Sequence, residues 1–208
     1  MNYWKASDEK KIIAINRIQQ DFFGKITYIF DPPLPKGVLN RLKKIVTSAG
    51  IVKGDAVLDV GSGTGILLPL IQKYEPSAIY ACDLSKSMLE SLNKQHPYAK
   101  PVLADIRNLN LPDSSIDVVF VNACYSNLVD KKGFFNNIAR IMKPDGRLVI
   151  SHPMGKSFID LLRARSPFPL DDFPEKKDAE RLLEQQGLKI KLFIDKPNLY
   201  ILVAVYSK

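Results

Sequence analysis

The sequence predicts an α/β fold: a doubly wound, mostly parallel sheet of seven strands with an antiparallel C-terminal pair, preceded by N-terminal helices. Two observations lead to this prediction. From Asp55 onward, short apolar runs alternate with segments of helical periodicity, which is the pattern of parallel strands joined by crossover helices. Near the C-terminus, two apolar runs flank a connection, residues 195–198, that is only long enough to join them antiparallel.

The first fifty residues are expected to contribute two helices ahead of the sheet. Apolar residues recur at helical spacing in Lys11–Gln20, and Val38–Val46 carries a second apolar face that is closed by Gly50. Asp31–Pro35 lies between them and is rich in proline, which lacks an amide donor, so a stiff connector is predicted. Met1–Pro35 is therefore a candidate lid over a site on the sheet.

The remaining elements follow from apolar runs and their periodicity. The predicted parallel strands are Ala56–Val60, Ala78–Cys82, Val102–Ala104, Ile116–Val121 and Arg147–Ser151, and the predicted C-terminal pair is Leu188–Ile194 and Leu199–Tyr206. Helices are predicted over Ile66–Tyr74, Lys86–Gln95, Lys131–Met142 and Glu175–Gln186. Lys143–Gly146 has the composition of a turn.

Length and composition indicate one globular domain, 1–208, with helices in residues 1–50 and the sheet in residues 51–208. No apolar run approaches the roughly 18 residues of a membrane span. The N-terminal residues are polar where a secretory signal would be apolar, so a cytoplasmic location is expected. Cys82 and Cys124 end apolar runs and are expected to be reduced thiols, with no zinc-binding spacing and no metal site. The oligomeric state is not indicated.

The formal net charge is +8, and Met1–Lys53 holds ten Lys and Arg against four Asp and Glu. A basic surface attracts nucleic acid, anionic lipid or acidic small molecules, although scattered lysines are more often a solvated face. No Arg-rich run and no basic stretch interleaved with aromatic residues occurs. The solvated face is favoured, and nucleic acid stays open as a less favoured partner.

A buried strand runs directly into a glycine-rich turn at Val57–Gly65. Gly61, Gly63 and Gly65, with Ser62 and Thr64 between them, let the backbone turn tightly and let a ligand lie against the main chain. The turn follows the carboxyl end of the first predicted strand, where open α/β sheets bind ligands. Dinucleotide-binding sheets usually show Gly-x-Gly-x-x-Gly, and a Walker loop requires Gly-Lys-Ser/Thr, so neither is indicated.

The run Asp59-x-Gly61-x-Gly63-x-Gly65 resembles the first motif of class I S-adenosylmethionine-dependent methyltransferases, which have a Rossmann-like fold. The resemblance covers roughly Asp55 to Ser151. It is closest to the small-molecule group that includes the quinone-biosynthesis methyltransferases. It implies S-adenosylmethionine as cofactor, with Asp59 and the glycine-rich turn as part of its binding site.

Two further carboxylates lie where the resemblance implies them. Asp83 ends the second strand about 20 residues beyond the glycines, where an acid can accept both ribose hydroxyls, and Leu84 would cover one adenine face. Asp105 and Ile106 follow the third strand and would bracket the adenine amine and ring. Each acid by itself is equally compatible with a helix cap or a loop. Their occurrence after three consecutive strands favours the cofactor site.

The implied chemistry needs little from the protein beyond positioning. A methyl sulfonium is already electrophilic, so the main task is to hold an acceptor lone pair in line and exclude water. If the acceptor is a phenol, enol or protonated amine, a base would add about 10²-fold or more. His152 follows the fifth strand and is the preferred base, with a structural histidine as the alternative. His96, at a helix end, is expected to cap.

Asn122 and Tyr125 form a second candidate group. Amino-methyltransferases carry Asn/Asp-Pro-Pro-aromatic after this strand, and Asn122-Ala-Cys-Tyr125 matches the first and fourth positions but lacks both prolines. Because of this departure, methylation of a nitrogen on a planar base or amide is less favoured. The four residues are more simply explained as an ordinary loop. Asn122 is kept as a cofactor-site candidate and Tyr125 as a catalytic candidate.

The acceptor side is expected in the least regular segments, Met1–Pro35 and Pro153–Pro174. The second of these carries Phe158, Leu161, Leu162, Arg163, Arg165 and Phe168. The apolar residues predict a partly apolar acceptor, and the arginines predict an anionic one if they face it. Core packing of the apolar residues and solvation of the arginines are the alternative explanations. The favoured function is methyl transfer to a small molecule. The alternatives are an RNA or protein methyltransferase, a non-catalytic S-adenosylmethionine-binding module and a nicotinamide oxidoreductase.

Overall fold

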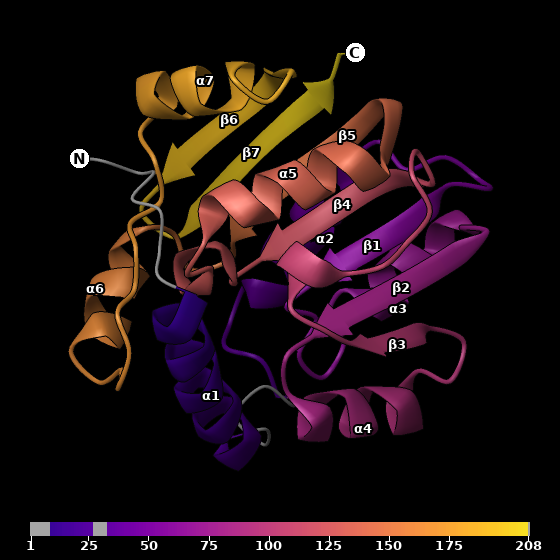
Figure 1. Ribbon diagram of the computed structural model, residues 1–208. Coiled ribbons are helices and arrows are strands. Elements are labelled where there is room, and N and C mark those ends of the chain that lie inside the picture. Colours follow the sequence, from indigo (N-terminus) through magenta and orange to yellow (C-terminus); the bar gives the residue numbers. More distant parts are fainter. Residues whose placement is uncertain (1–8, 27–32, 208) are drawn as a thin grey trace.

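The computed structural model describes residues 9–26 and 33–207, which form a mixed sheet of seven strands with helices on both faces (Figure 1). The strand order is β3-β2-β1-β4-β5-β7-β6. Strands β1 to β5 pair in parallel, whereas β7 runs antiparallel to both β5 and β6. The predicted fold class is confirmed, including the antiparallel C-terminal pair.

The strands are β1 Ala56–Val60, β2 Ala78–Asp83, β3 Lys100–Leu103, β4 Ile116–Asn122, β5 Met142–His152, β6 Leu188–Lys196 and β7 Leu199–Tyr206. The α-helices are α1 Glu9–Lys25, α2 Val38–Ser48, α3 Leu68–Ile71, α4 Lys86–Gln95, α5 Lys131–Ile141, α6 Ser157–Arg163 and α7 Lys176–Glu184. Short 3-10 helices are η2 Gln72–Tyr74, η3 Ile106–Asn108 and η4 Tyr125–Asn127. The predicted connector and candidate lid lie partly outside the described residues.

Besides shifts of the ends of several elements, three features differ from the sequence prediction. The helix expected over Ile66–Tyr74 begins only at Leu68, because the turns of the glycine loop continue through residue 67, and it ends in the 3-10 helix η2. The turn expected at Lys143–Gly146 lies within β5, where the register with β4 shifts and Asp145 adopts a φ of 62°. Helix α6 has a single buried residue, Ile159, so exposed leucines mask its periodicity in the sequence.

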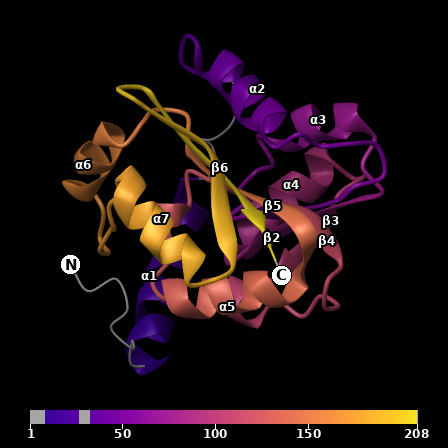
Figure 2. The same ribbon diagram turned by 90° about the horizontal axis from the view of Figure 1, so that it is seen from above.

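Alternating residues of the strands build two apolar layers. Leu58 and Val60 face one layer with α5 and α7, whereas Val57 faces the other layer with α2, α3 and α4. Figure 2 shows α2 and α3 on one side of the sheet and α5 and α7 on the other. Because central parallel strands are covered on both faces, they are mainly apolar, as the apolar runs in the sequence indicated.

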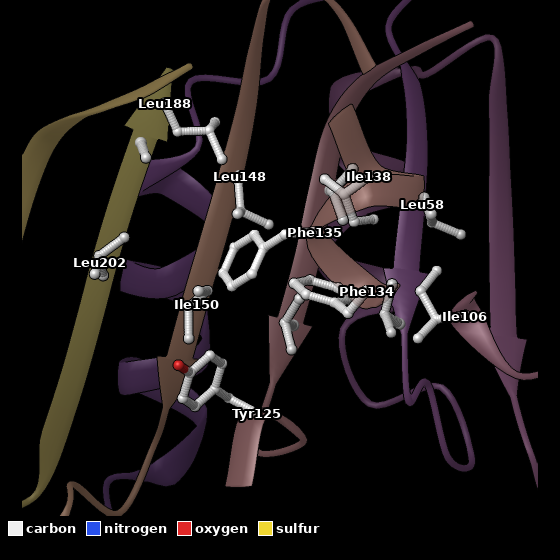
Figure 3. Close-up of a cluster of buried hydrophobic side chains, with 14 of the residues drawn as sticks. Leu58, Ile106, Tyr125, Phe134, Phe135, Ile138, Leu148, Ile150, Leu188 and Leu202 are labelled. Atoms are coloured by element: carbon white, nitrogen blue, oxygen red, sulfur yellow. The ribbon is translucent and has the colours of Figure 1, made fainter. Parts of the chain in front are cut away.

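Helix α5 provides the aromatic centre of the first layer (Figure 3). Phe134 and Phe135 are fully buried, and their rings meet edge to face with centroids 4.9 Å apart. They lie over the strand residues Leu58, Leu148 and Ile150. Truncating one such buried phenylalanine to alanine costs about 3–5 kcal/mol. This packing fixes the carboxyl ends of β1, β4 and β5 relative to one another.

No helix in the part of the chain that the structure describes has the length and apolar character needed to cross a membrane.

Candidate active site

One cavity, of about 580 Å³, lies at the carboxyl edge of the parallel strands. It is lined by the glycine loop after β1, by the residues that follow β2, β3, β4 and β5, and by α1 and α6. In Figure 1 the ends of these strands point toward α1. Its volume lies within the range of about 300–1,000 Å³ that small-molecule sites occupy. The position at the strand ends is the one predicted from the sequence.

The three glycines of the loop have different structural roles. Gly61 has a φ of +65°, and a Cβ there would lie 2.3 Å from the Sγ of Cys124. Gly65 has a φ of +91°, and its Cβ would lie 2.6 Å from the ring of His96, so His96 packs on the loop besides ending α4. Gly63 has a φ of +54° and no atom within 4 Å of the Cβ position. Gly63 therefore leaves open space inside the cavity, which is what a ligand lying on the main chain requires.

Asp83 lies at the end of β2, and its carboxylate is hydrogen-bonded to the glycine loop. Its Oδ2 accepts a hydrogen bond from the backbone N–H of Gly63, and its Oδ1 accepts one from Ser85, both at 2.8 Å. Burial raises the pKa of Asp83, and these backbone hydrogen bonds oppose that shift. A carboxylate offers about four lone-pair sites, so these backbone bonds leave acceptor capacity for a hydroxyl of a ligand.

Asp59 lies behind the loop and is not among the residues that line the cavity. Its side chain is 2% exposed. Burial, reinforced by the charge of Asp83, raises the pKa of Asp59 to about 8. At neutral pH this carboxyl is therefore mostly protonated, and it can donate a hydrogen bond as well as accept one.

Asp105 is already engaged by its neighbours. Its Oδ2 accepts hydrogen bonds from Asn16 of α1 at 2.8 Å and from the Nε of Arg107 at 2.9 Å, and its Oδ1 accepts one from the backbone N–H of Arg107 at 3.0 Å. The guanidinium of Arg107 also bonds Glu9 with two contacts, 2.9 and 3.2 Å long. The hydrogen bond from Arg107 lowers the pKa of Glu9. These contacts fasten α1 beside the cavity.

His152 ends β5 and lines the cavity. Its side chain is 3% exposed, and its Nδ1 accepts a hydrogen bond from the backbone N–H of Met154 at 3.1 Å. Burial lowers the pKa of His152 to about 4, so the ring is neutral at physiological pH. Asn122 also lines the cavity, and its Oδ1 accepts a hydrogen bond from the hydroxyl of Ser151 at 3.0 Å.

Tyr125 does not line the cavity, in contrast to the expectation for a catalytic residue. Its ring is fully buried in the layer that α5 covers, below Ile150 in Figure 3. Phe173 lies 5.5 Å from it, and the ammonium of Lys131 lies 4.8 Å from the ring centroid. The residue turns inward because it begins the 3-10 helix η4 instead of extending β4. In this arrangement Tyr125 packs in the core and is not part of the cavity wall.

Apart from Asp59 and Gly65, the predicted cofactor residues meet at the cavity wall. Those that line it are Gly61, Ser62, Gly63, Thr64, Asp83, Leu84, Asp105, Ile106 and Asn122. The hydroxyls of Ser62 and Ser126 also belong to cavity-lining residues, and both are buried without a hydrogen-bond partner among the described residues. Buried polar atoms are normally paired, but both oxygens are also closed off from solvent, so a ligand in the cavity would bond them only after the serine side chain rotates.

The far half of the cavity is mainly apolar. Aromatic and aliphatic side chains from α1, α6 and the segment after α6 wall it, namely Phe22, Phe23, Phe158, Ile159, Leu162, Phe168 and Leu170. Phe22, Phe23 and Phe168 form a ring cluster with centroids 5.4–5.7 Å apart. Arg165 lines this half, whereas Arg163 is paired with Asp160 and Asp172.

Two polar wall residues on α1 escaped the sequence analysis. Asn16 and Gln19 line the cavity, and the amide of Gln19 donates to the carbonyl of Asn127 at 2.9 Å. Both lie on the apolar side of α1 that carries Ile12 and Ile15. A polar residue repeated on an otherwise apolar helix face was the signal available in the sequence.

Cys82 and Cys124 are free thiols, as predicted, although Cys124 is only partly buried and lines the cavity. Within residues 9–26 and 33–207, no group of three or more His, Cys, Asp or Glu side chains is placed to hold a metal ion.

Comparisons with known proteins agree with this geometry. A family model described as a methyltransferase domain matches residues 58–150. Demethylmenaquinone methyltransferase of Paenarthrobacter aurescens is 32% identical over 159 residues, which are 72% of this chain and 60% of that protein. Malonyl-[acyl-carrier protein] O-methyltransferase 1 of Ilyobacter polytropus is 29% identical over 178 residues, which are 83% of this chain and 64% of that protein. The chain spans less than two thirds of the length of these relatives.

Solved structures share the fold at low sequence identity. Magnesium protoporphyrin IX methyltransferase of Synechocystis, with bound SAH, has a TM-score of 0.70 at 17% identity, covering 93% of this chain and 100% of that one. A SAM-dependent methyltransferase of Aquifex aeolicus has a TM-score of 0.70 at 20% identity, covering 88% of this chain and 98% of that one.

Proposed function

We propose that the chain transfers a methyl group from S-adenosylmethionine to a small-molecule acceptor. The match of residues 58–150 to a model described as a methyltransferase domain supports this proposal. The observation that carries the proposal is one continuous cavity. It joins the open glycine loop and Asp83 at one end to an apolar, aromatic chamber at the other. A cofactor on the first half would present its reactive group to whatever the second half holds.

The residues of the first half fit the cofactor in two respects. Gly63 leaves the main chain open, and the carboxylate of Asp83 keeps acceptor capacity for a ribose hydroxyl. Leu84 and Ile106 line the same wall as apolar surfaces for a purine ring. Asp105 already accepts hydrogen bonds from Asn16 and Arg107. It could accept one from the purine amine only in addition to these.

When bound, S-adenosylmethionine supplies an electrophilic methyl group, so the chain itself has to orient the acceptor and exclude water. Helix α1 and the segment after α6 wall the chamber and keep it apolar. His152 and Ser126 are polar groups of that wall. These features favour a partly apolar small molecule, and Arg165 supports an anionic group on it. A cytoplasmic location remains a prediction of the sequence.

Two relatives suggest acceptor classes for testing. One is named for demethylmenaquinone and the other for malonyl-[acyl-carrier protein], an acyl group carried on a protein. An RNA or protein acceptor is less favoured, because a polymer segment would have to enter a chamber walled by α1 and α6. Salt-dependent RNA binding by the purified chain would favour that alternative.

The test starts with calorimetric titration of the purified chain against S-adenosylmethionine and NAD. We expect saturable binding of the first only. Release of S-adenosylhomocysteine is then measured with a small-molecule fraction of cell extract and with the RNA and protein fractions, using Asp83→Ala as the inactive control. Release that depends on the small-molecule fraction is expected. Binding of NAD in place of S-adenosylmethionine would overturn the proposal, and cofactor binding without release in any fraction would favour a non-catalytic module.

A further inference from the structure

The neighbours of His152 restrict the orientation of its ring and determine its tautomer, and therefore which hydrogen bond it can make to an acceptor. The ring is held between Phe158 and Phe173, with centroids 5.5 and 5.8 Å away, and it faces the cavity from the end of β5. Across the sheet, His152 pairs in register with Tyr200 of β7. The two phenylalanine rings therefore restrict the orientation of the imidazole.

The hydrogen bond to Nδ1 decides the tautomer. The backbone N–H of Met154 can only donate, so Nδ1 of His152 must accept, at 3.1 Å. A neutral imidazole carries a single ring proton, which therefore resides on Nε2. Nε2 has no partner among the described residues, and it is not one of the orphan polar atoms sealed away from solvent. The Nε2–H donor is thus left for a molecule in the cavity.

Helix α2 holds the turn that sets this tautomer. The Nε of Arg41 donates to the carbonyl of Pro153 at 2.5 Å, and its Nη2 lies 3.5 Å from the Sδ of Met154. Arg41 therefore anchors both residues that follow His152. Burial of the ring is what disfavours its protonation and lowers the pKa of His152.

We propose that His152 serves as a fixed Nε2–H donor to an unprotonated oxygen of the acceptor, that it does not act as a base, and that Arg41 is its positioning residue. The inference rests on the proposed function and narrows the acceptor class to molecules with a carbonyl, carboxylate or ionised hydroxyl oxygen at this point. The acceptor enters without a proton on the atom to be methylated. Its electron pair forms the new bond to carbon while the carbon–sulfur bond breaks, the sulfur keeps that electron pair, and His152 keeps its proton throughout.

The tautomer can be measured without any acceptor. The chain has only two histidines, His96 and His152. The variant His96→Gln, labelled with ¹⁵N in histidine, contains one imidazole ring, that of His152. The NMR chemical shifts and couplings of its two nitrogens report which of them carries the proton. We expect the Nε2–H form from pH 5.5 to 8.5, without titration. A proton on Nδ1, or a midpoint between pH 6 and 7, would overturn the proposal even if methyl transfer is established.

Arg41→Gln tests the positioning role in the same spectrum. We expect mixed tautomers, because the turn at Pro153 and Met154 loses its anchor. Lys44→Gln, an exposed change on the same helix, should leave the spectrum unchanged. An unaltered spectrum in the Arg41 variant would remove Arg41 from the proposal.

Activity separates a donor from a base once an acceptor responds. Glutamine retains an N–H donor but cannot accept a proton, so His152→Gln should stay within about 10-fold of the parent in kcat/KM. His152→Leu, which lacks the donor, should lose a further 10- to 100-fold, the range of one hydrogen bond to a charged group. Equal losses in the two variants, with unchanged thermal midpoints, would instead indicate a base.

Discussion

The carboxylate of Asp83 at the end of β2 accepts a hydrogen bond from the backbone N–H of Gly63 at 2.8 Å. This contact ties the acid of the second strand to the middle of the glycine loop that follows the first. Since β1 and β2 pair in parallel, with Val60 opposite Cys82, the two segments emerge side by side. One side chain therefore shapes the loop and also offers its remaining lone pairs to a ligand.

Asp83→Asn should weaken S-adenosylmethionine binding by about 10- to 100-fold, because charge-assisted hydrogen bonds to the ribose are lost, worth about 1.5–3 kcal/mol. The dissociation constant is measured by calorimetry. Glu75→Gln, an exposed acid paired with Lys53, is the control and should bind normally. Unchanged affinity in the Asp83 variant would move the ribose site elsewhere.

Gly61→Ala should destabilise the fold more than Gly63→Ala. Both place alanine at a positive φ, at a cost of about 1–2 kcal/mol, but at Gly61 the new Cβ also overlaps Cys124. Denaturant unfolding should show a loss above about 3 kcal/mol for Gly61→Ala. Adding Cys124→Gly should recover part of it, whereas equal losses at the two glycines would contradict the contact. Gly63→Ala should mainly reduce cofactor affinity.

Asp59→Asn should change how stability depends on pH. The folded protein holds a proton on Asp59 up to about pH 8, whereas the unfolded chain releases it near pH 4, so stability falls as pH rises between these values. The isosteric amide removes this loss. We expect the variant to gain at least about 1 kcal/mol relative to the parent on going from pH 5 to pH 9, about 2–4 °C in thermal midpoint.

Thermal melts at both pH values check this prediction. Asp113→Asn, an exposed acid paired with Arg140, should leave the pH profile unchanged. Parallel profiles for Asp59→Asn and the parent would mean that Asp59 ionises normally in the folded protein.

Arg107→Gln should loosen α1. Arg107 joins Glu9 of that helix to Asp105, so its loss frees the start of the helix and leaves Asn16 as the hydrogen bond between α1 and that acid. We expect amide hydrogen exchange across residues 9–25 to rise by about 10-fold or more, with little change in β4. Arg181→Gln, which breaks an exposed pair with Asp178, serves as control. Unchanged exchange in α1 would show that its apolar face alone holds it.

Tyr125→Phe should keep methyl transfer within about 2-fold, because the ring packs in the core and does not line the cavity. Tyr125→Ala should destabilise the fold by about 3–5 kcal/mol, as for other buried aromatic truncations. Initial rates and unfolding curves distinguish the two effects. A large loss of turnover in the phenylalanine variant at unchanged stability would restore a catalytic role.

The sequence by itself determined the sheet and the cofactor half of the site. Each strand that carries a candidate acid is a short apolar run, and Asp83 and Asp105 follow such runs directly. In a parallel sheet the carboxyl ends of neighbouring strands lie at one edge, so local pattern alone places these side chains together. Periodicity also located β7 and α4 with the bounds that the structure has.

Only the tertiary structure decided the acceptor half and the state of its groups. That half is built by α1 and α6, which approach the sheet from opposite ends of the sequence, and no local pattern encodes such a meeting. The inward turn of Tyr125, the protonation of Asp59 and the tautomer of His152 likewise depend on long-range burial and on one backbone N–H. Hydrogen-bond direction and desolvation are properties of the folded surroundings, so residue type leaves them undetermined.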